Sequence, residues 1–381
     1  MPPAPRIAAP PESGPGPDPG SKAGPGPGPG PGPGRDGFSR GRFSRFGGML
    51  QRQLLWIMLT SYLLAALVPG PGIALRGVTL GRVGAASFPL QAGLLAVVVF
   101  NAGLTARTEQ LPRLLRRPGP LLLGVLLNAL LPTLLLAAAS VAAEGWHSER
   151  EAQSLLTGLA LIGAMPVAAG ATVFAQGGDG NATLSLGLVL GSTVLSPLTI
   201  PLGLHLGGWL TTGDYAGDLH ATARSSGSVF AVVAVTVPCL LGLLARWFAQ
   251  RTGHSLQRAL PTIRLVNLGV VVLLGYSNAC GALGQVLHRP DPDFLALVVA
   301  AAALMCGCSF LTGWVVAARL RMDRADGIAL TYASGMNNSS AGAVLAATRI
   351  PDHPAVLLPI LAYSLLQKIL AGAVSRFLSC G

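Results

Sequence analysis

The sequence predicts an all-α membrane protein of ten transmembrane helices, built as two inverted five-helix repeats. Three observations lead to this fold class. The 381 residues are 51% apolar and only 11% charged, whereas about a quarter of a soluble domain is charged. Ten apolar stretches are long enough to cross about 30 Å of hydrocarbon. Two of them, one in each half of the chain, are interrupted by glycine and by proline or amide residues.

Charge and cysteine content exclude other classes. A net charge of +11 would fit a nucleic-acid-binding protein only if the basic residues shared a face with aromatic ones. Aromatic residues are 6% of the chain and are scattered among apolar stretches, so we expect no nucleic-acid partner. The five cysteines lack the paired spacing of a zinc site. No cofactor or metal centre is therefore expected.

Residues 1–48 predict a disordered cytoplasmic tail rich in proline and glycine. Gly24–Gly34 alternates these two residues, and its surroundings hold almost nothing that a core would bury. A secretory signal would place an apolar segment near the start of the chain. The first long apolar stretch begins only near Leu54, so we expect no cleaved signal.

The ten predicted spans divide equally between two halves of the chain. The first half, residues 49–215, has stretches near 53–69, 86–104, 119–142, 154–176 and 182–208. The second half, residues 216–381, has stretches near 228–249, 262–284, 293–317, 325–347 and 354–377. Because each half has an odd number of spans, the second half enters the membrane from the opposite side, and the repeats are inverted.

Lysine and arginine residues predict the orientation, because cytoplasmic loops collect them. With the N-terminus inside, 20 of the 26 fall on the inner side and six on the outer side. We therefore expect a multi-pass protein of the cell (inner) membrane, with the N-terminus and the C-terminus in the cytoplasm.

The interrupted spans, the fourth of each half, are expected to form the functional site. The first break contains Pro166 and Gly170, and the second contains Gly335 followed by Asn337 and Asn338. Irregular backbone at membrane depth is tolerated only where protein or a water-filled cavity surrounds it. Paired breaks in corresponding positions are typical of secondary transporters that bind their substrate between repeats.

Three segments together resemble the bile acid:sodium symporter family. They are Pro166–Pro197, which includes the turn Gly178–Asn181, then Ala329–Ser339, and more weakly Phe100–Thr105. The resemblance covers residues 50–378. It implies a panel domain from helices 1, 2, 6 and 7 and a core domain from helices 3–5 and 8–10, in which discontinuous helices 4 and 9 cross. It also implies that sodium drives the uptake of a small organic anion, bile-acid-like or a smaller carboxylate, bound between panel and core.

The resemblance further implies which residues bind substrate or ion. They lie in the two breaks and in neighbouring helices: Asn128, Thr172, Ser185, Ser334, Met336, Asn337 and Asn338. Several positions depart from the pattern of sodium-using members. Ala171 and Thr172 replace a Ser-Asn pair, and Ala333 stands where a glutamate is usual.

These departures weaken the expected sodium site. A hard cation prefers several oxygen ligands, ideally with a carboxylate among them, and neither break contains Asp or Glu. A single weak site made of Thr172, Ser185, Asn338 and backbone carbonyls is one expectation. The other is a proton-linked or uncoupled carrier, in which the ammonium of Lys368 takes the place of a bound cation.

Each candidate residue also has a purely structural interpretation. Asn337 and Asn338 would satisfy backbone groups that the break sets free. Thr172 and Ser185 would bond their own helix. Lys368 would extend its ammonium to the inner interface.

For the whole chain, the leading hypothesis is a secondary transporter of a small organic anion that works by alternating access. The alternative is a membrane receptor or scaffold that keeps the fold without transport. An enzyme is not expected, because no HExxH sequence, Ser-His-Asp set or pair of carboxylates lies at membrane depth. Membrane lipids are the other expected partner, and the sequence leaves the oligomeric state open.

Overall fold

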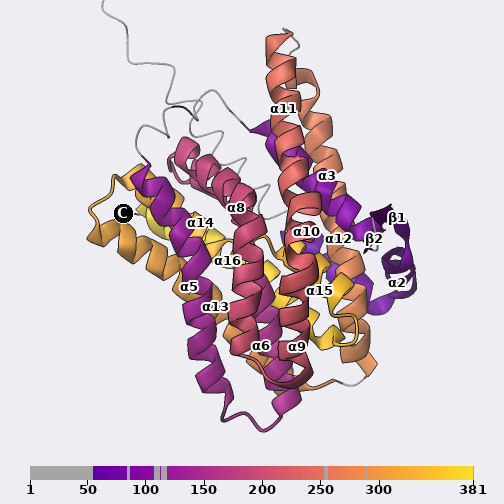
Figure 1. The fold of residues 1–381 in the computed structure, drawn as a ribbon. Helices are drawn as coiled ribbons and strands as arrows, with labels where there is room; N and C mark the ends of the chain where they lie inside the picture. Colours follow the sequence, from indigo (N-terminus) through magenta and orange to yellow (C-terminus); the bar gives the residue numbers. More distant parts are fainter. Residues whose placement is uncertain are drawn as a thin grey trace, which may run out of the picture. The chain divides into compact units, whose positions relative to one another are not determined.

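The computed structural model describes residues 55–83, 86–106, 112, 118–252, 256–288 and 290–380 (Figure 1). The described residues all belong to one compact unit. The predicted tail, residues 1–48, and the start of the first predicted span lie outside the described residues.

Helices account for nearly all of the described chain. The first half contains a helix at Leu55–Leu67, followed by α2 Gly70–Gly77, β1 Thr79–Val83, β2 Ala86–Pro89, α3 Leu90–Thr105, α5 Gly119–Ala143, α6 Glu149–Gly163, α7 Gly170–Gly177 and α8 Ala182–Trp209. The second half contains α9 Gly213–Ala221, a π-helical segment Thr222–Gly227, α10 Ser228–Phe230, a second π-helical segment Ala231–Thr236, α11 Val237–Arg251, a 3₁₀ turn Leu256–Arg258, α12 Leu260–His288, α13 Pro292–Arg319, α14 Arg324–Gly335, α15 Ser339–Arg349, a 3₁₀ turn Pro354–Val356 and α16 Leu357–Cys380.

Each of the ten predicted ranges overlaps a helix among the described residues, and the fourth and ninth ranges each cover two helices separated by a break. Among the described residues, six helices are long and apolar enough to cross a membrane. Leu55–Leu67 and Gly70–Gly77 make a seventh if this bent pair is counted as one span. The length and apolar character of these helices indicate a mostly helical protein that crosses the membrane several times.

The region between the first two predicted spans differs from expectation. The prediction starts the second span at residue 86, but Ala86–Pro89 pairs as an antiparallel strand with Thr79–Val83, and the helix begins only at Leu90. Before this hairpin the chain turns by 93° between Leu67 and Gly70. Pro69, with no N–H to donate, explains why the first helix stops there. Apolar length alone does not distinguish such a strand from a helix.

The link between the halves also holds an element that the sequence did not predict. Residues 215 and 216, where the two predicted repeats meet, both lie inside α9. This short helix packs against α8 and continues directly into the π-helical segment Thr222–Gly227.

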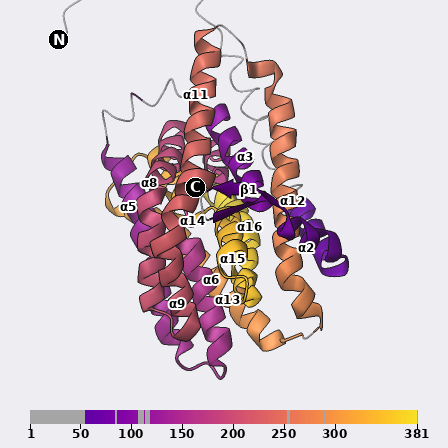
Figure 2. The same ribbon diagram turned by 45° about the vertical axis from the view of Figure 1, so that its right-hand side comes forward.

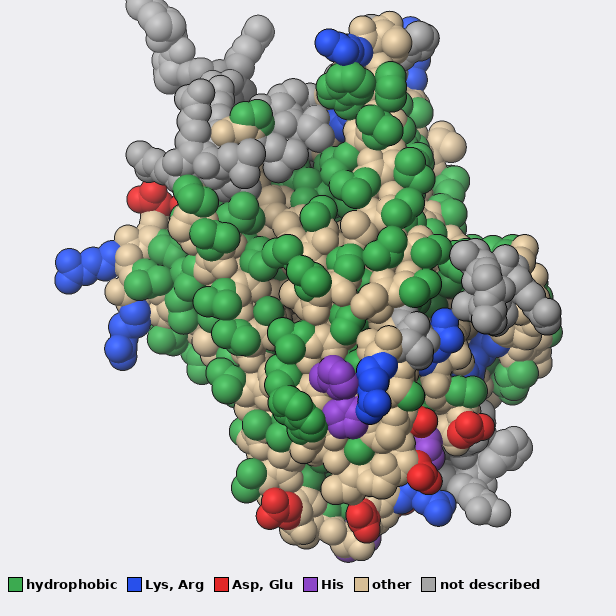
Figure 3. Space-filling model, viewed as in Figure 1, with side chains coloured by type: hydrophobic (Ala, Val, Ile, Leu, Met, Phe, Trp, Pro, Cys, Tyr) green, Lys and Arg blue, Asp and Glu red, His purple; other side chains and the backbone are tan. Residues whose placement is uncertain are grey.

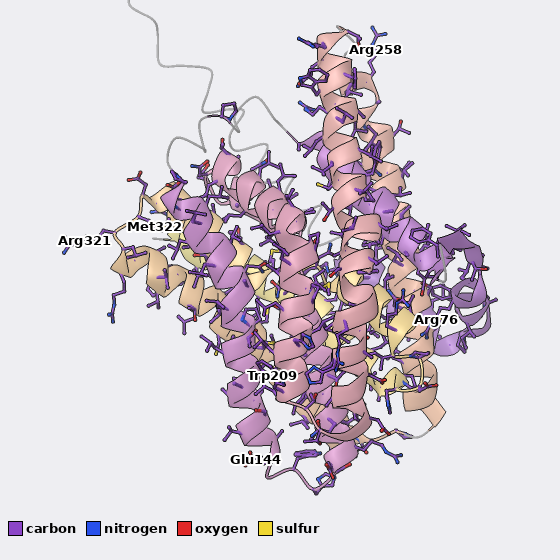
Figure 4. All side chains as sticks on the ribbon, in the orientation of Figure 1. Arg76, Glu144, Trp209, Arg258, Arg321 and Met322 are labelled. Carbon is purple, nitrogen blue, oxygen red and sulfur yellow. The ribbon has the colours of Figure 1, made fainter. Side chains whose placement is uncertain are left out.

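Packing and surface fit a membrane environment. Figures 1 and 2 show α11 running beside α3, and α15 packs on α16. Figure 3 shows hydrophobic side chains over the flank of the molecule and most of the visible acidic ones in its lower part. Leu134, Leu198 and Leu304 are about two-thirds exposed or more, at 67%, 72% and 68%. Glu144 and Arg258 lie at opposite ends (Figure 4). An apolar surface of this kind is suited to contact with the lipid of a membrane.

Candidate functional site

The two helix breaks meet each other, although about 170 residues separate them in the sequence. One break follows α6, which ends at Gly163, and precedes α7, which begins at Gly170. The other follows α14, which ends at Gly335, and precedes α15, which begins at Ser339. Gly335 and Gly170 are therefore helix ends, and the irregular backbone lies just outside them.

A short antiparallel bridge joins the two breaks. The backbone N–H of Ala168 donates to the carbonyl of Met336 at 2.8 Å, and the N–H of Asn338 donates to the carbonyl of Pro166 at 2.9 Å. Backbone groups that leave a helix at membrane depth need such partners. Each break thus satisfies polar groups of the other.

The side chain of Asn337 ties three elements together. This residue is 1% exposed. Its Nδ2 donates to the carbonyl of Ile162, near the end of α6, at 3.2 Å. Its Oδ1 accepts from Nδ2 of Asn128 on α5 at 3.0 Å. The structure therefore brings two predicted site residues, Asn128 and Asn337, into direct contact, and Asn337 also does the structural task of satisfying a freed carbonyl.

The other predicted residues lie around this bridge with mainly local bonds. Asn338 caps α15, because its Oδ1 accepts from the N–H of Ala341 at 3.2 Å. The hydroxyl of Ser185 on α8 donates to Oγ1 of Thr172 on α7 at 3.3 Å. Ser334 donates to Leu330 within its own helix at 2.9 Å.

Met336 is 2% exposed and lies in the second break, where its methyl group is the nearest atom to the space beside Gly170. Pro166 supplies the carbonyl that accepts from the other break.

Three residues that the sequence analysis did not select also support the breaks. Ser192 on α8 accepts a hydrogen bond from the N–H of Val167 at 3.0 Å. The hydroxyl of Tyr363 donates to the carbonyl of Gly335 at 3.2 Å. Gln367 donates through Nε2 to Oγ of Ser339, the first residue of α15, at 3.1 Å.

Gln367 is the most informative of these three. It is 3% exposed, and its Oε1 is buried with no hydrogen-bond partner in the described part of the chain. A buried amide oxygen without a partner is costly. An amide in an apolar span was the available sequence signal, but Gln367 stands alone and far from either break in the sequence, whereas Asn337 lies next to Asn338 in the second break.

Lys368 makes two hydrogen bonds, both one turn back in α16. Its ammonium donates to the carbonyl of Ser364 at 2.7 Å and to the hydroxyl of Ser364 at 3.2 Å. The residue is half-buried. These contacts fit a structural role for Lys368. That its ammonium takes the place of a bound cation stays a prediction.

The breaks offer neutral oxygen atoms and helix ends, not carboxylates. Ala333 is 1% exposed and Ala171 is fully buried, so neither apolar position opens to solvent. In the described ranges, no group of three or more His, Cys, Asp and Glu side chains is placed to hold a metal ion. Both α7 and α15 begin at the breaks, and a helix N-terminus carries a partial positive charge.

Comparisons with known proteins give one family match and two distant relatives. The model of the sodium bile acid symporter family matches residues 92–287, just over half of the chain. Among similar proteins of Bacillus subtilis, the uncharacterized protein YbaS is 26% identical over 289 residues, which are 75% of this chain and 87% of YbaS. The uncharacterized sodium-dependent transporter YocS is 26% identical over 262 residues, which are 69% of this chain and 75% of YocS.

Proposed function

We propose a function from one premise, which is that this chain belongs to the sodium bile acid symporter family. Members of this family are secondary transporters rather than enzymes. The long apolar helices agree with a multi-pass membrane protein. The substrate, the coupling ion and the movement of this chain are proposals that rest on that premise.

The proposed activity is the transport of a small organic anion by alternating access. The observation that carries it is the pairing of the two breaks through Ala168–Met336 and Asn338–Pro166. Half-helix N-termini beside irregular backbone are the usual way in which transporters hold an anionic group. In this proposal ten spans form two inverted repeats, panel and core domains enclose the substrate, and helices 4 and 9 cross between them.

The substrate is proposed to be bile-acid-like or a smaller carboxylate. Its carboxylate would lie near the N-terminus of α15, where Asn338, Ser339 and Gln367 gather. These side chains offer amide and hydroxyl donors, and the positive helix end favours negative charge. Met336 and the apolar residues around the break suit the remainder of the molecule.

Sodium coupling is proposed to be weak. Thr172 and Ser185, 3.3 Å apart through their oxygens, with Asn338 and break carbonyls, give one set of neutral ligands. No carboxylate occurs in either break to balance the charge of the ion. YocS is described as sodium-dependent, which supports testing sodium first.

The proposed location is the cell (inner) membrane, with both termini in the cytoplasm. The excess of lysine and arginine on one side of the predicted topology supports this orientation.

Ligand-induced stabilisation tests binding and coupling together. Purified full-length protein is heated with taurocholate or with pyruvate, in sodium chloride or in choline chloride. We expect at least one anion to raise Tm, with a modest sodium effect, and the shift to disappear in Gln367→Leu. Absence of any shift in every salt contradicts the proposed site.

Uptake by proteoliposomes separates transport from binding. We expect uptake of the stabilising anion. Binding without uptake under sodium, proton or no gradient favours the receptor or scaffold, for which the replacement of a glutamate by Ala333 is the supporting observation.

Lys368→Met decides between the two interpretations of the lysine. The bonds to Ser364 lead us to expect that uptake persists in this variant. Loss of uptake with normal protein stability supports instead a proton-linked or uncoupled carrier that needs the ammonium.

A further inference from the structure

The helix α8 has two gaps in its hydrogen-bond ladder. Pro197 and Pro201 have no N–H, so the carbonyls of Thr193 and Pro197, four residues earlier, lose their helical donors. This helix is one of the candidate membrane spans. In hydrocarbon no water replaces the missing donors, so partners must come from protein.

Both freed carbonyls receive hydroxyl donors from the next span. Thr236 Oγ1 donates to the carbonyl of Thr193 at 3.0 Å, and Ser228 Oγ donates to the carbonyl of Pro197 at 3.3 Å. Ser196 adds a local bond to the carbonyl of Thr193 at 2.8 Å. We call the two bonds from Thr236 and Ser228 the hydroxyl clip.

The π-helical segment Ala231–Thr236 explains how one helix reaches both carbonyls. Residues eight apart on a straight α-helix point about 80° away from each other, since each residue turns the helix by about 100°. Between Ser228 and Thr236 the chain runs through the π-helical segment. A π turn holds more residues than an α turn, which brings the two hydroxyls closer to one face. Local π segments often mark functional positions.

The clip lies next to the support of the first helix break. Ser192 accepts from the N–H of Val167 in that break, and the clipped carbonyl belongs to the following residue, Thr193. Residues 192–197 of α8 therefore join the break on one side to Ser228 and Thr236 on the other. Ser192, Thr193, Ser196 and Thr236 are all buried.

We propose that Pro197 and Pro201, with Thr236 and Ser228, form a hinge at which the span α10–α11 pivots on α8. This hinge rests on the proposed transport function, because it would let the two spans shift relative to each other beside the break. Side-chain hydroxyl bonds can open and close again without unwinding either helix. Pro197 and Pro201 remove two backbone hydrogen bonds from α8 at the same level. Thr236 and Ser228 are thus positioning residues rather than ligands.

A double-mutant cycle tests whether the clip replaces the missing ladder donor. Thr236→Val keeps the shape but removes the donor, and we expect Tm to fall by several degrees. Pro197→Ala supplies an N–H to the carbonyl of Thr193, so in Pro197→Ala/Thr236→Val most of that loss should be recovered. Thr348→Val is the matched control, because Thr348 donates only within its own helix. An unchanged Tm in Thr236→Val, or simply additive losses in the double variant, overturns the clip.

Hydrogen exchange tests the hinge itself. In the wild-type protein we expect amides 198–200 of α8 to exchange at least tenfold faster than amides 184–190 of the same helix. Pro197→Ala/Thr236→Val should remove that difference. Uniform exchange along wild-type α8, or a difference that the double variant leaves intact, overturns the hinge. Neither measurement requires transport, so a failure of the hinge is distinguishable from a failure of the proposed function.

Discussion

The break between α6 and α7 spans six residues, 164–169, whereas the break between α14 and α15 spans three, 336–338. The longer break contributes backbone groups and relies on Ser192 and the partner break to satisfy them. The shorter one brings its own amides, Asn337 and Asn338, which bond to α5, α6 and α15. The two breaks therefore hold different chemistry, and the polar side chains are concentrated in the second break.

Asn337→Ala is expected to have the largest effect. It removes the donor to Ile162 and the acceptor of Asn128 in a buried site, and unsatisfied buried groups cost about 1–3 kcal/mol each. We expect a marked fall in Tm and loss of anion-induced stabilisation. Asn128→Ala is the control with a smaller effect, since Asn337 keeps its bond to Ile162. A larger loss in Asn128→Ala would contradict the central role of Asn337.

The glycines at the helix ends give a direct comparison of the two breaks. A Cβ on Gly335 would come within 2.4–2.5 Å of the ring of Phe310, whereas a Cβ on Gly170 would meet only the methyl group of Met336 at 3.4 Å. Overpacking costs about 1–3 kcal/mol, so Gly335→Ala should lower Tm clearly.

Gly170→Ala should leave Tm unchanged or slightly raised, because alanine favours a helix over glycine. Thermal unfolding of both variants in the same detergent checks this pair. Equal losses would mean that the first break is as tightly packed as the second.

A feature of this site can be predicted from the sequence when neighbouring residues alone determine it, and not when it depends on a contact with a distant residue. An apolar stretch and an amide within it are local features, so the helix ranges and Asn337 can be predicted from the sequence. The roles of Ser192 and Gln367 depend on partners far along the chain, Val167 and Ser339. Single serines and amides in membrane helices mostly serve as helix contacts, and only the folded chain shows which ones reach a break.

The hairpin Thr79–Pro89 was missed for a different reason. Its second strand is apolar and runs directly into α3, so apolar length extends the predicted span over it. The strand conformation of Ala86–Pro89 follows from its pairing with Thr79–Val83. The periodicity of so short a segment cannot distinguish a strand from a helix.

Ala333→Glu tests whether the second half has lost a sodium ligand. The position is buried beside the break, so an unpaired carboxylate there should destabilise the protein in choline chloride. In sodium chloride we expect the loss to be reduced, since an ion that binds only the folded state stabilises it. Ala171→Glu, in the first break, should show no rescue by sodium. Equal Tm values in both salts for Ala333→Glu would contradict a residual ion site.

The smallest effect is expected where α9 links the two halves, away from both breaks. His220 on α9 and His205 on α8 share a hydrogen bond of 2.8 Å between their Nδ1 atoms, which needs one donor and one acceptor. Partial burial, with the neighbouring His205 and Arg224, lowers the pKa of His220 from 6.5. The unfolded chain therefore takes up the proton more readily, and the contribution of His220 to stability is complete above about pH 6.5 and is lost as pH falls through the lower folded pKa.

We expect Tm of the wild-type protein to fall by a small amount as the pH drops below about 6.5, and His220→Gln to remove this fall. Asp218, also on α9, lies 3.7 Å from His353. His353→Gln is therefore the control, because it changes another histidine contact of α9 and leaves the pair His205–His220 intact. A pH dependence unchanged in His220→Gln would show that the link between the halves does not respond to this proton.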